Sequence, residues 1–523
     1  MRNMKNILKY TLITTIFVGG VACTNLDEKL PGAYTKTFVP SNPGFGVPTN
    51  VNTAQPLDGL QAAFNGLLSG TATNGGFFAV QEGGTDEAVI TQKGGDWYDG
   101  GLYIKIHQHQ FSATTWAIND TWNQAYNGIF QCNTLLASIT DPLKIAQLRF
   151  LRAYYYWRLM DVFGNIKIVK TAGVDAPQGT RLAAYSFIES ELLAAIPDLP
   201  DGKQAYGRVS KSGAHALLSR LYLNAKVYTG TQQYQKAIDE ADAVLNLTPF
   251  GATTQGTVYD LDASYASVFA PDNINPKEMI FAVPFDQITG GGATWPHMTL
   301  HYPSQLTYQL SAQPWNGFST LEDFYNSYDA NDKRRAANFI TGPQYYPDGV
   351  TPVLDIAYDK ADPDGAPLNF TPHINMLYPN ASRQAGARFG KFSIKTYQLT
   401  NADNDYPILR LAEVMLNKAE ALFMLNGYTD PNGLALVKKI TDRAGAPMPS
   451  PMNATTLLAE RGREMFIESI RRTDMIRFGA YFGTWWENPG DPDPANHGLM
   501  AIPTEQIQAA LGTANPLTQN PGY

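Results

Sequence analysis

The hydrophobic positions of this 523-residue chain recur mainly with the spacing of α-helices. In residues 120–163, apolar side chains lie three or four positions apart and therefore share one helical face. These side chains are Leu151, Tyr154, Tyr155, Leu159 and Val162. The sequence Phe163-Gly164-Asn165 predicts the end of this helix, because glycine and asparagine commonly follow the last helical turn.

Two further segments predict pairs of helices joined at a glycine. In residues 211–246 two apolar helical faces are separated by a turn at Gly230, and Ser210 is the predicted N-cap of the first helix. A second pair is predicted at 407–443, with its turn at Gly427. Both pairs resemble tetratricopeptide repeats. Because such a pair cannot bury its apolar face alone, they predict a larger helical scaffold, to which residues 455–478 add another amphipathic helix.

Residues 250–400 follow neither pattern. They are rich in proline, glycine, aspartate and aromatic residues, and only short runs such as 279–283 read as strands. We interpret this region as a loop-rich insert carried by the helical scaffold. Loops on a rigid scaffold often hold binding residues, so the insert is one place to look for a site.

The first 23 residues predict export and lipidation. Three basic residues, Arg2, Lys5 and Lys9, precede an uncharged apolar run at 10–22 that is too short to span a bilayer. Small residues then precede Cys23, as in a bacterial lipobox, although Gly20 stands where leucine is usual. We therefore expect a lipoprotein signal peptide at 1–22, a lipidated tether at 23–50, and a folded domain at 51–523.

Composition narrows the class of ligand. The net charge of −8 and the lack of a basic tract argue against nucleic acid as a partner. Charged residues make up 16% of the chain, below the roughly 25% of typical soluble domains, whereas aromatic residues make up 12%. This balance favours a neutral, hydroxyl-rich ligand.

The cysteine count excludes an intramolecular disulfide if Cys23 is lipidated. The chain has 2 cysteines, so Cys132 would then stand alone. Because Cys132 lies in a helical pattern, we expect it to be a small buried residue.

The segment 94–101 is the first candidate for a binding site. It places Asp96, Trp97, Tyr98 and Asp99 between pairs of glycines, which excludes a helix interior. Tryptophan and tyrosine combine an apolar face with a polar group, and the neighbouring carboxylates accept hydrogen bonds from hydroxyls. The alternative is that Trp97 packs into the core.

A second aromatic cluster lies in the loop-rich insert. It consists of Trp295, Tyr302, Tyr308 and Trp315. With the first segment it provides the candidate ligand contacts Asp96, Trp97, Tyr98, Asp99, Trp295, Tyr302 and Trp315.

Motifs for catalysis or metal binding are not found in the sequence. Hydrolase, zinc-protease and phosphate-loop signatures are absent. The carboxylates Glu82, Asp86, Glu87 and Asp96 could form a glycosidase pair, but acidic residues near glycines more often cap turns. Neither His107 with His109 nor His297 with His301 has a third ligand at metal-site spacing. Residues 359–365 resemble a calcium loop without its final glutamate. We predict no cofactor, no metal and no catalytic residue.

Several motifs, in order from the N-terminal region to the last residue, resemble signatures of the SusD/RagB family. They are RFLRAYYY at 149–156 with DVFGNI at 161–166, GRVSKSGA at 207–214, LRLAEV at 409–414, ERGRE at 460–464 followed by Glu468, Arg471, Asp474 and Arg477, and QNPGY at 519–523. We expect these motifs to be structural: Tyr154, Tyr155 and Tyr156 in the core, and the charged residues, spaced three apart, as ion pairs on one helix face that fix helix docking.

The resemblance implies a mainly α-helical fold in which tetratricopeptide-like pairs support a loop-rich face. It also implies a non-catalytic lipoprotein anchored to the outer membrane and exposed at the cell surface. Such proteins capture a glycan, or in some members a peptide, and deliver it to a SusC-like TonB-dependent transporter. Members of the family bind ligands through loop aromatics, which again points to the two aromatic clusters.

Three alternatives remain open from the sequence. The chain could capture peptides, it could be a surface glycoside hydrolase built on a helical scaffold, or it could be a repeat scaffold that binds only protein. A hydrolase would need two essential carboxylates and would turn over a polysaccharide. A protein-binding scaffold would bind neither glycan nor peptide.

Lipidation of Cys23 can be tested directly. Because the thiol is the site of acylation, Cys23→Ser should release the protein from the membrane fraction or leave the signal peptide uncleaved. Fractionation followed by mass measurement distinguishes these forms from the wild type. A mature, membrane-bound Cys23→Ser protein would contradict the lipoprotein prediction.

Overall fold

The computed structural model describes residues 59–523 apart from 69, 204–205, 252–257, 272, 274–275, 288–292, 356–364 and 492. The predicted signal peptide, Cys23 and the tether lie outside this part of the chain. All described residues belong to one unit, Gln55–Tyr523. Its α-helices are α1 (Gln61–Asn65), α2 (Gly76–Glu82), α3 (Leu102–His107), α4 (Trp116–Leu136), α5 (Pro142–Phe163), α6 (Arg181–Ala195), α7 (Lys211–Leu223), α8 (Ala225–Thr229), α9 (Tyr234–Leu245), α10 (Trp295–Thr299), α11 (Ser304–Tyr308), α12 (Glu322–Asn326), α13 (Lys333–Asn338), α14 (Leu411–Asn426), α15 (Pro431–Ala444), α16 (Ala454–Met465), α17 (Arg471–Arg477) and α18 (Thr504–Ala510).

Strands are short and form two-stranded antiparallel ladders. The ladders join β1 (Val89–Ile90) to β5 (Phe318–Ser319), β2 (Ile166–Lys167) to β3 (Gln178–Gly179), β4 (Met279–Val283) to β10 (Tyr406–Arg410), β6 (Phe339–Ile340) to β9 (Arg388–Phe389), and β7 (Gly342–Pro343) to β8 (Asn369–Phe370). Single turns of 3₁₀-helix occur at η1 (Asp99–Gly101), η2 (Ile196–Asp198) and η3 (Ala266–Phe269). The prediction of a mainly α-helical fold is therefore confirmed.

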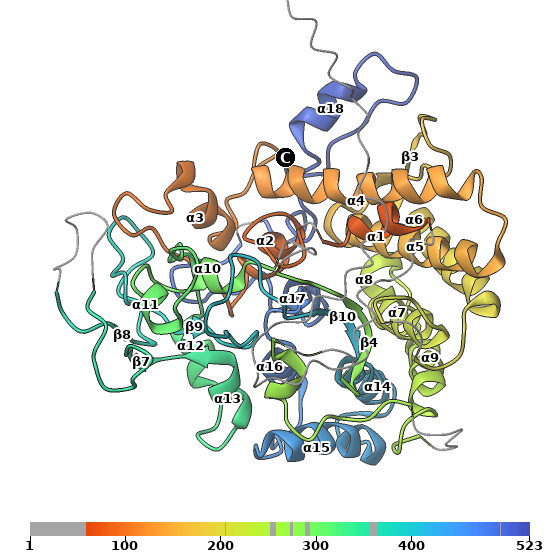
Figure 1. The fold of residues 1–523 in the computed structure, drawn as a ribbon. Coiled ribbons are helices and arrows are strands. Elements are labelled where there is room, and N and C mark those ends of the chain that lie inside the picture. Colours follow the sequence, from red (N-terminus) through yellow and green to blue (C-terminus); the bar gives the residue numbers. More distant parts are fainter. Residues whose placement is uncertain are drawn as a thin grey trace, which may run out of the picture. The chain divides into compact units, whose positions relative to one another are not determined.

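The long helices pack in series. Helix α4 packs on α5, α5 on α6, α6 on α7, α7 on α9, and α9 on α14. The series continues through α16 and α17, and α17 contacts α2, which packs back on α4. Figure 1 shows α4 to α9, α14 and α15 on one side of the unit and the short elements α10 to α13 and β7 to β9 on the other. The scaffold and the loop-rich insert are thus distinct regions.

The helical segment predicted at 120–163 is two helices rather than one. Helix α4 ends at Leu136, and α5 begins after Asp141, whose carboxylate accepts hydrogen bonds from the backbone N–H groups of Leu143 and Lys144. Proline at the first position of α5 suits a helix start, because its missing N–H has no partner there. The predicted end is confirmed: α5 stops at Phe163, and Gly164 has a φ of 68°.

Both predicted helix pairs are present, with two local differences. Helices α7 and α9 form the first pair, and Gly230 ends the short intervening helix α8 with a φ of 78°. Ser210 occupies the N-cap of α7, but its hydroxyl lies against the Tyr259 hydroxyl at 3.4 Å and does not cap the helix. In the second pair residues 406–410 are strand β10, and helix begins only at Leu411.

The single helix predicted at 455–478 is wrong. Helix α16 ends at Met465 and α17 begins at Arg471. Between them Ile467 and Ser469 have φ values of 51° and 59°, which a continuous helix does not allow. The break turns Glu468 toward Arg410, and it lets the Ile467 N–H donate to Glu87 at 3.0 Å. Burial of charge therefore overrides the helical pattern here.

A central ladder attaches the loop-rich insert to the scaffold. Strand β4, predicted from its apolar run, pairs with β10, which leads directly into α14. All five residues of each strand are buried. The α-helices of the insert have five or six residues each. Side-chain contacts rather than regular structure therefore fix the conformation of the insert.

The tyrosines of the RFLRAYYY motif lie in the core, as predicted. Tyr155 and Tyr156 have no exposed surface, and the Tyr155 hydroxyl donates to the Ala63 carbonyl at 2.7 Å. Its ring crosses α4 at Gly128, where a β-carbon would lie 2.4 Å from the ring. Cys132 on the same helix is buried, and burial raises the pKa of its thiol to about 12. The residue is therefore a packing residue and not a reactive thiol.

A buried network of charges joins the insert to the scaffold. Arg410, at the end of β10, contacts Glu464 at 2.7 Å, Glu468 at 2.7 Å and Glu278 at 3.2 Å. Arg443 of α15 pairs with both Glu278 and Glu464. None of these side chains is more than 5% exposed. Glu278 lies just before β4, so its carboxylate ties the first strand of the central ladder to two scaffold segments, the end of β10 and α15.

Two cations from the insert extend this network. Arg334 of α13 donates to Glu460 at 2.7 Å and to Glu464 at 3.0 Å, and Lys391 donates to Glu468 at 2.6 Å. Although burial alone would raise it, the pKa of Glu464 is held well below its usual range by Arg443, Arg410 and Arg334. Removing one partner from such a network leaves a buried unpaired charge and typically costs about 3–5 kcal/mol.

The charged residues after α16 are ion-paired and buried, as the motif predicted, but they do not share one helix face. Asp474 accepts from Arg461 at 2.7 Å and from Arg477 at 2.7 Å, whereas Arg471 reaches Asp86 at 2.7 Å. These contacts fix α17 against α16 and against the segment after α2.

Two of the carboxylates noted in the sequence, Glu82 and Glu87, are fully buried beside this network. Burial, and next the nearby Glu87, raises the pKa of Glu82 well above its usual range. Burial also raises the pKa of Glu87. The folded chain therefore keeps at Glu82 a proton that the unfolded chain loses.

Among the described residues, no helix is both long and apolar enough to cross a membrane.

The raised pKa of Glu82 makes stability depend on pH. The contribution of protonated Glu82 to the free energy of unfolding is complete below the pKa of the unfolded chain, about 4.3. It is lost as pH rises from there toward the pKa of the folded chain, by up to about 1.4 kcal/mol per pH unit for one proton. Since Glu82→Gln cannot ionise, the variant should gain melting temperature over the wild type as pH rises from 5 to 8.

The exposed Glu487→Gln serves as the control and should show no such trend. If the difference in melting temperature between Glu82→Gln and the wild type stays constant from pH 5 to 8, Glu82 is already ionised in the folded protein.

Candidate ligand-binding cleft

The glycine-framed segment 94–101 forms a tight turn that projects its side chains. Lys93 and Asp96 exchange backbone hydrogen bonds of 3.0 and 3.2 Å. Trp97 and Asp99 then have φ values of 61° and 42°, a left-handed conformation that is uncommon outside glycine. Gly100 and Gly101 of η1 continue this left-handed conformation, with φ values of 67° and 79°. The segment is therefore not a helix interior, as predicted, although it ends in the single 3₁₀ turn η1.

A second loop, at 313–317, brings Trp315 to the same place. Three backbone hydrogen bonds hold this loop on α10 and the residues after it: Trp315 to His297 at 2.6 Å, Asn316 to Leu300 at 2.9 Å, and Gly317 to Met298 at 2.7 Å. The Trp315 side chain remains 39% exposed, with its ring centroid 5.8 Å from that of His297.

Trp97 joins the two loops. Its indole N–H donates to the Trp315 carbonyl at 2.6 Å, and its ring lies over Gly317, where a β-carbon would come within 2.7 Å. The buried Lys93 amino group donates to the Gly317 carbonyl at 3.2 Å. Residues more than two hundred positions apart therefore form one surface.

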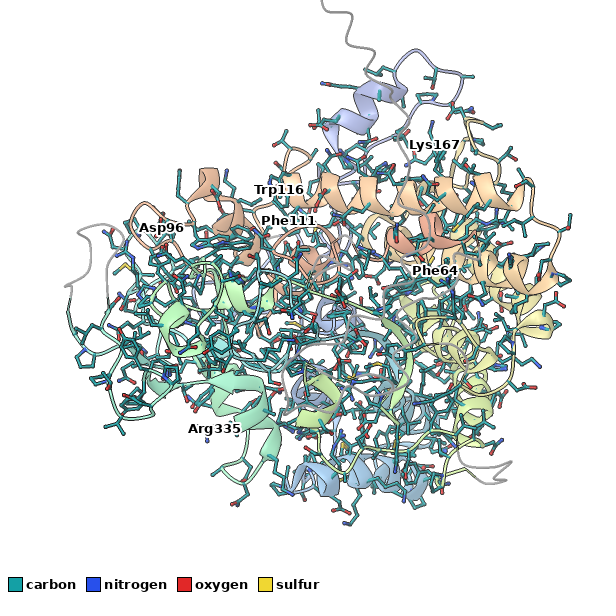
Figure 2. The ribbon with its side chains drawn as sticks, viewed as in Figure 1. Phe64, Asp96, Phe111, Trp116, Lys167 and Arg335 are labelled. Atoms are coloured by element: carbon teal, nitrogen blue, oxygen red, sulfur yellow. The ribbon has the colours of Figure 1, made fainter. Side chains whose placement is uncertain are left out.

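The two loops and Tyr302 enclose a depression of about 490 Å³ that we call the aromatic cleft. It is lined by Asp96, Trp97, Asp99, Tyr302, Gln313, Pro314 and Trp315. This volume lies within the range of small-ligand sites, roughly 300–1,000 Å³. Figure 2 shows Asp96 at the edge of the loop-rich side of the unit.

Carboxylates give the cleft its electrostatic character. Asp96 and Asp99 line it, and its lining in the described chain contains neither lysine nor arginine. The Tyr302 hydroxyl donates to Asp96, and the Arg383 guanidinium lies 3.9 Å from the same carboxylate. The lining can therefore accept hydrogen bonds from ligand hydroxyls, whereas it would repel an anionic ligand.

Buried polar groups support the cleft from below. His301 carries its proton on Nε2 and donates to Asp355 at 2.6 Å, because its Nδ1 accepts the backbone N–H of Tyr302 at 2.9 Å. Burial lowers the pKa of His301, so the ring is neutral. Burial also lowers the pKa of Lys93 well below its usual range. These groups hold the backbone of Tyr302 and Gly317 in place.

Five of the seven candidate residues meet in this cleft: Asp96, Trp97, Asp99, Tyr302 and Trp315. Tyr98 is 53% exposed but does not line it. Sequence reasoning missed Gln313 and Pro314, whose only signal was their position directly before Trp315.

The assignment of Trp295 to the site is wrong. Its ring is 2% exposed, stacks on Phe392 with centroids 5.7 Å apart, and meets Phe78 at 4.3 Å. Trp295 begins the short helix α10, whose five residues are all buried. The indole is therefore part of the core that supports the cleft and cannot reach a ligand. Tyr308, from the same cluster, packs against a smaller apolar cluster and does not line the cleft.

The other groups considered for chemistry do not line the cleft. Glu82 and Glu87 are buried, and Asp86 is paired with Arg471. The four histidines at 107, 109, 297 and 301 are buried and hydrogen-bonded. Most of the calcium-like segment lies outside the described residues. Within the described part of the chain, no three His, Cys, Asp or Glu side chains are grouped to hold a metal ion.

Family models match two long parts of the chain. The model of the SusD family matches residues 277–523, and a SusD-like model described as "Starch-binding associating with outer membrane" matches residues 79–223. The starch-binding protein SusD of Bacteroides thetaiotaomicron is 28% identical over 535 aligned residues, which cover 91% of each chain.

Solved structures share the fold. A SusD superfamily protein from Parabacteroides distasonis superposes with a TM-score of 0.68 at 22% identity, covering 89% of this chain and 99% of the other. A laminarin-binding SusD-like protein gives the same score and identity, covering 89% and 98%. With two SusD-type models, a relative aligned over nine-tenths of its length and a shared fold, the chain belongs to the SusD/RagB family.

Proposed function

We propose that this protein binds a neutral glycan at the cell surface through the aromatic cleft. The observation that carries the proposal is the meeting of Trp97 and Trp315, joined by an indole hydrogen bond, beside two carboxylates. Neither tryptophan is fully buried, and an exposed aromatic surface of this kind marks an interaction site.

The chemistry of the cleft suits a sugar ring. The C–H face of a sugar is apolar and packs on an indole, while its hydroxyls donate hydrogen bonds. Asp96 and Asp99 are charged acceptors, and each such bond contributes about 1.5–3 kcal/mol. One stacked ring and one or two such bonds would account for micromolar to millimolar affinity.

The names of the relatives narrow the proposed ligand to a neutral glucan. One is described as starch-binding, one as laminarin-binding, and a surface glycan-binding protein A is described in complex with laminarihexaose. Starch and laminarin are uncharged polymers of glucose, which agrees with a lining of two carboxylates and no cation.

The alternatives have less support. None of the relatives named above is described as a peptide binder. For hydrolysis, two carboxylates must flank the scissile bond as acid and as base or nucleophile. We propose binding without cleavage, because the Asp96 carboxylate is already engaged by the Tyr302 hydroxyl and lies 3.9 Å from Arg383.

We further propose that a lipid on Cys23 anchors the protein in the outer membrane and that it passes glycan to a SusC-like TonB-dependent transporter. The signal-like N-terminus supports the anchor, and the family description "associating with outer membrane" supports the location. Delivery to a transporter rests on the family resemblance.

Trp315→Ala tests the cleft most cleanly, because its side chain is partly exposed and lies outside the core. Removing this ring should weaken binding of laminarihexaose or maltoheptaose at least about tenfold, or about 1.4 kcal/mol, with little change in melting temperature. Calorimetric titration of the soluble chain, residues 24–523, gives the affinity.

Tyr346→Ala is the matched control, since its side chain is 38% exposed and lies outside the cleft. Unchanged glucan affinity in Trp315→Ala would place the site elsewhere. Shortened products after incubation of the wild type with either glucan would instead identify a hydrolase.

A further inference from the structure

A second cleft adjoins the aromatic cleft and is lined in part by α3. It has a volume of about 410 Å³ and is lined by Asn74, Asp99, Gly100, Leu102, Tyr103, Lys105, Ser112, Thr114, Thr115 and Trp116. We call it the Trp116 cleft. Asp99 lines both clefts. Figure 2 shows Asp96 and Trp116 to either side of α3, which Figure 1 labels.

A rigid wall separates the two clefts below a shared rim. Trp97 meets Tyr103 edge-to-face with centroids 5.7 Å apart. The Tyr103 hydroxyl donates to the Asn74 carbonyl and accepts from the Asn74 amide, each at 3.0 Å. Trp97 faces the aromatic cleft and Tyr103 lines the Trp116 cleft, so one aromatic pair fixes the position of both.

The rim between the clefts is open. Gly100 lies there with a φ of 67°, and a β-carbon at this position would meet no atom within 4 Å. Its neighbour Asp99 is exposed. At Gly100 the rim therefore leaves space for a ligand that passes from Trp97 over Asp99 toward Trp116.

Trp116 has the form of a stacking platform. It is the first residue of α4, and its side chain is 47% exposed. The outer edge of its six-membered ring rests against Gly75, where a β-carbon would lie only 2.4 Å away. Glycine at this position makes room for one edge of the indole, and the side chain stays half-exposed.

Hydroxyl groups line the same cleft as this indole. Ser112 and Thr114 are exposed, their hydroxyl oxygens lie 3.0 Å apart, and the Ser112 N–H donates to the Thr115 hydroxyl at 3.0 Å. The Lys105 ammonium donates to the Gly100 carbonyl at 3.1 Å. Hydroxyls that both donate and accept, beside an open indole, match the chemistry of a sugar ring.

We propose that the Trp116 cleft is a second subsite for the same glycan chain. A long oligosaccharide stacks on Trp97 and Trp315, crosses the rim at Asp99 and Gly100, and stacks again on Trp116. A short oligosaccharide fills the aromatic cleft alone. This inference rests on the proposed glucan binding and adds to it a preference for long chains.

The test compares chain lengths in Trp116→Ala. Titrations use maltotriose and maltoheptaose, and laminaritriose and laminarihexaose, with the soluble chain. We expect Trp116→Ala to weaken binding of the six- or seven-unit ligand about tenfold and of the three-unit ligand less than about twofold. Trp315→Ala should weaken both lengths. Trp116→Phe, which keeps a ring, should retain most of the affinity for the long ligand.

Two further variants isolate the effect. Phe130→Ala removes another half-exposed aromatic side chain from α4, outside both clefts, and should change neither affinity. Thr114→Arg fills the Trp116 cleft without disturbing Gly75, and it should reproduce the loss for long ligands even if Trp116→Ala does not fold.

Equal effects of Trp116→Ala and Thr114→Arg on short and long ligands, or no effect on either, would overturn the second subsite while leaving glucan binding intact. If the wild-type chain binds neither series, the proposed glucan ligand fails and the second subsite fails with it.

Discussion

The fold depends on the burial of charge between the scaffold and the insert. Arg410 lies where β10 becomes α14, and it holds carboxylates from the start of β4, from α16 and from the break after α16. Arg334 and Lys391 bring the insert to the same carboxylates. Because a buried ion is tolerated only when it is paired, these segments must assemble together. The network thereby fixes the insert, and with it the loop that carries Trp315, against the helices.

The same constraint explains which parts of the fold could be predicted from the sequence. Helical spacing is local, so it located the end of α5 and the helix pairs α7 with α9 and α14 with α15 to within a few residues. The break between α16 and α17 depends on a contact distant in the sequence, because it turns Glu468 toward Arg410, 58 positions earlier. Likewise nothing near Trp295 in the sequence shows that Phe392 will cover it.

The candidate site divides in the same way. Glycines around Asp96, Trp97 and Asp99 predict a non-helical loop. An exposed aromatic residue in this loop can therefore be predicted from the neighbouring sequence alone. That Trp97 meets Trp315 is a property of the assembled fold, since 218 positions separate them. Trp116 gave no signal, because it reads as the first residue of a helix; its exposed face depends on contact with Gly75. The two adjoining clefts could therefore not be predicted from the sequence and are recognised only in the folded structure.

The central claim is that this rigid assembly holds Trp97 and Trp315 together as a platform for a neutral glycan. A crystal structure of residues 24–523 with laminarihexaose or maltoheptaose tests it most directly. We expect sugar rings stacked on Trp97 and Trp315, with hydroxyls against Asp96 or Asp99, and cleft side chains that superpose on their positions in the free protein. Sugar bound elsewhere, for instance against the outer faces of α7 and α9, would contradict it.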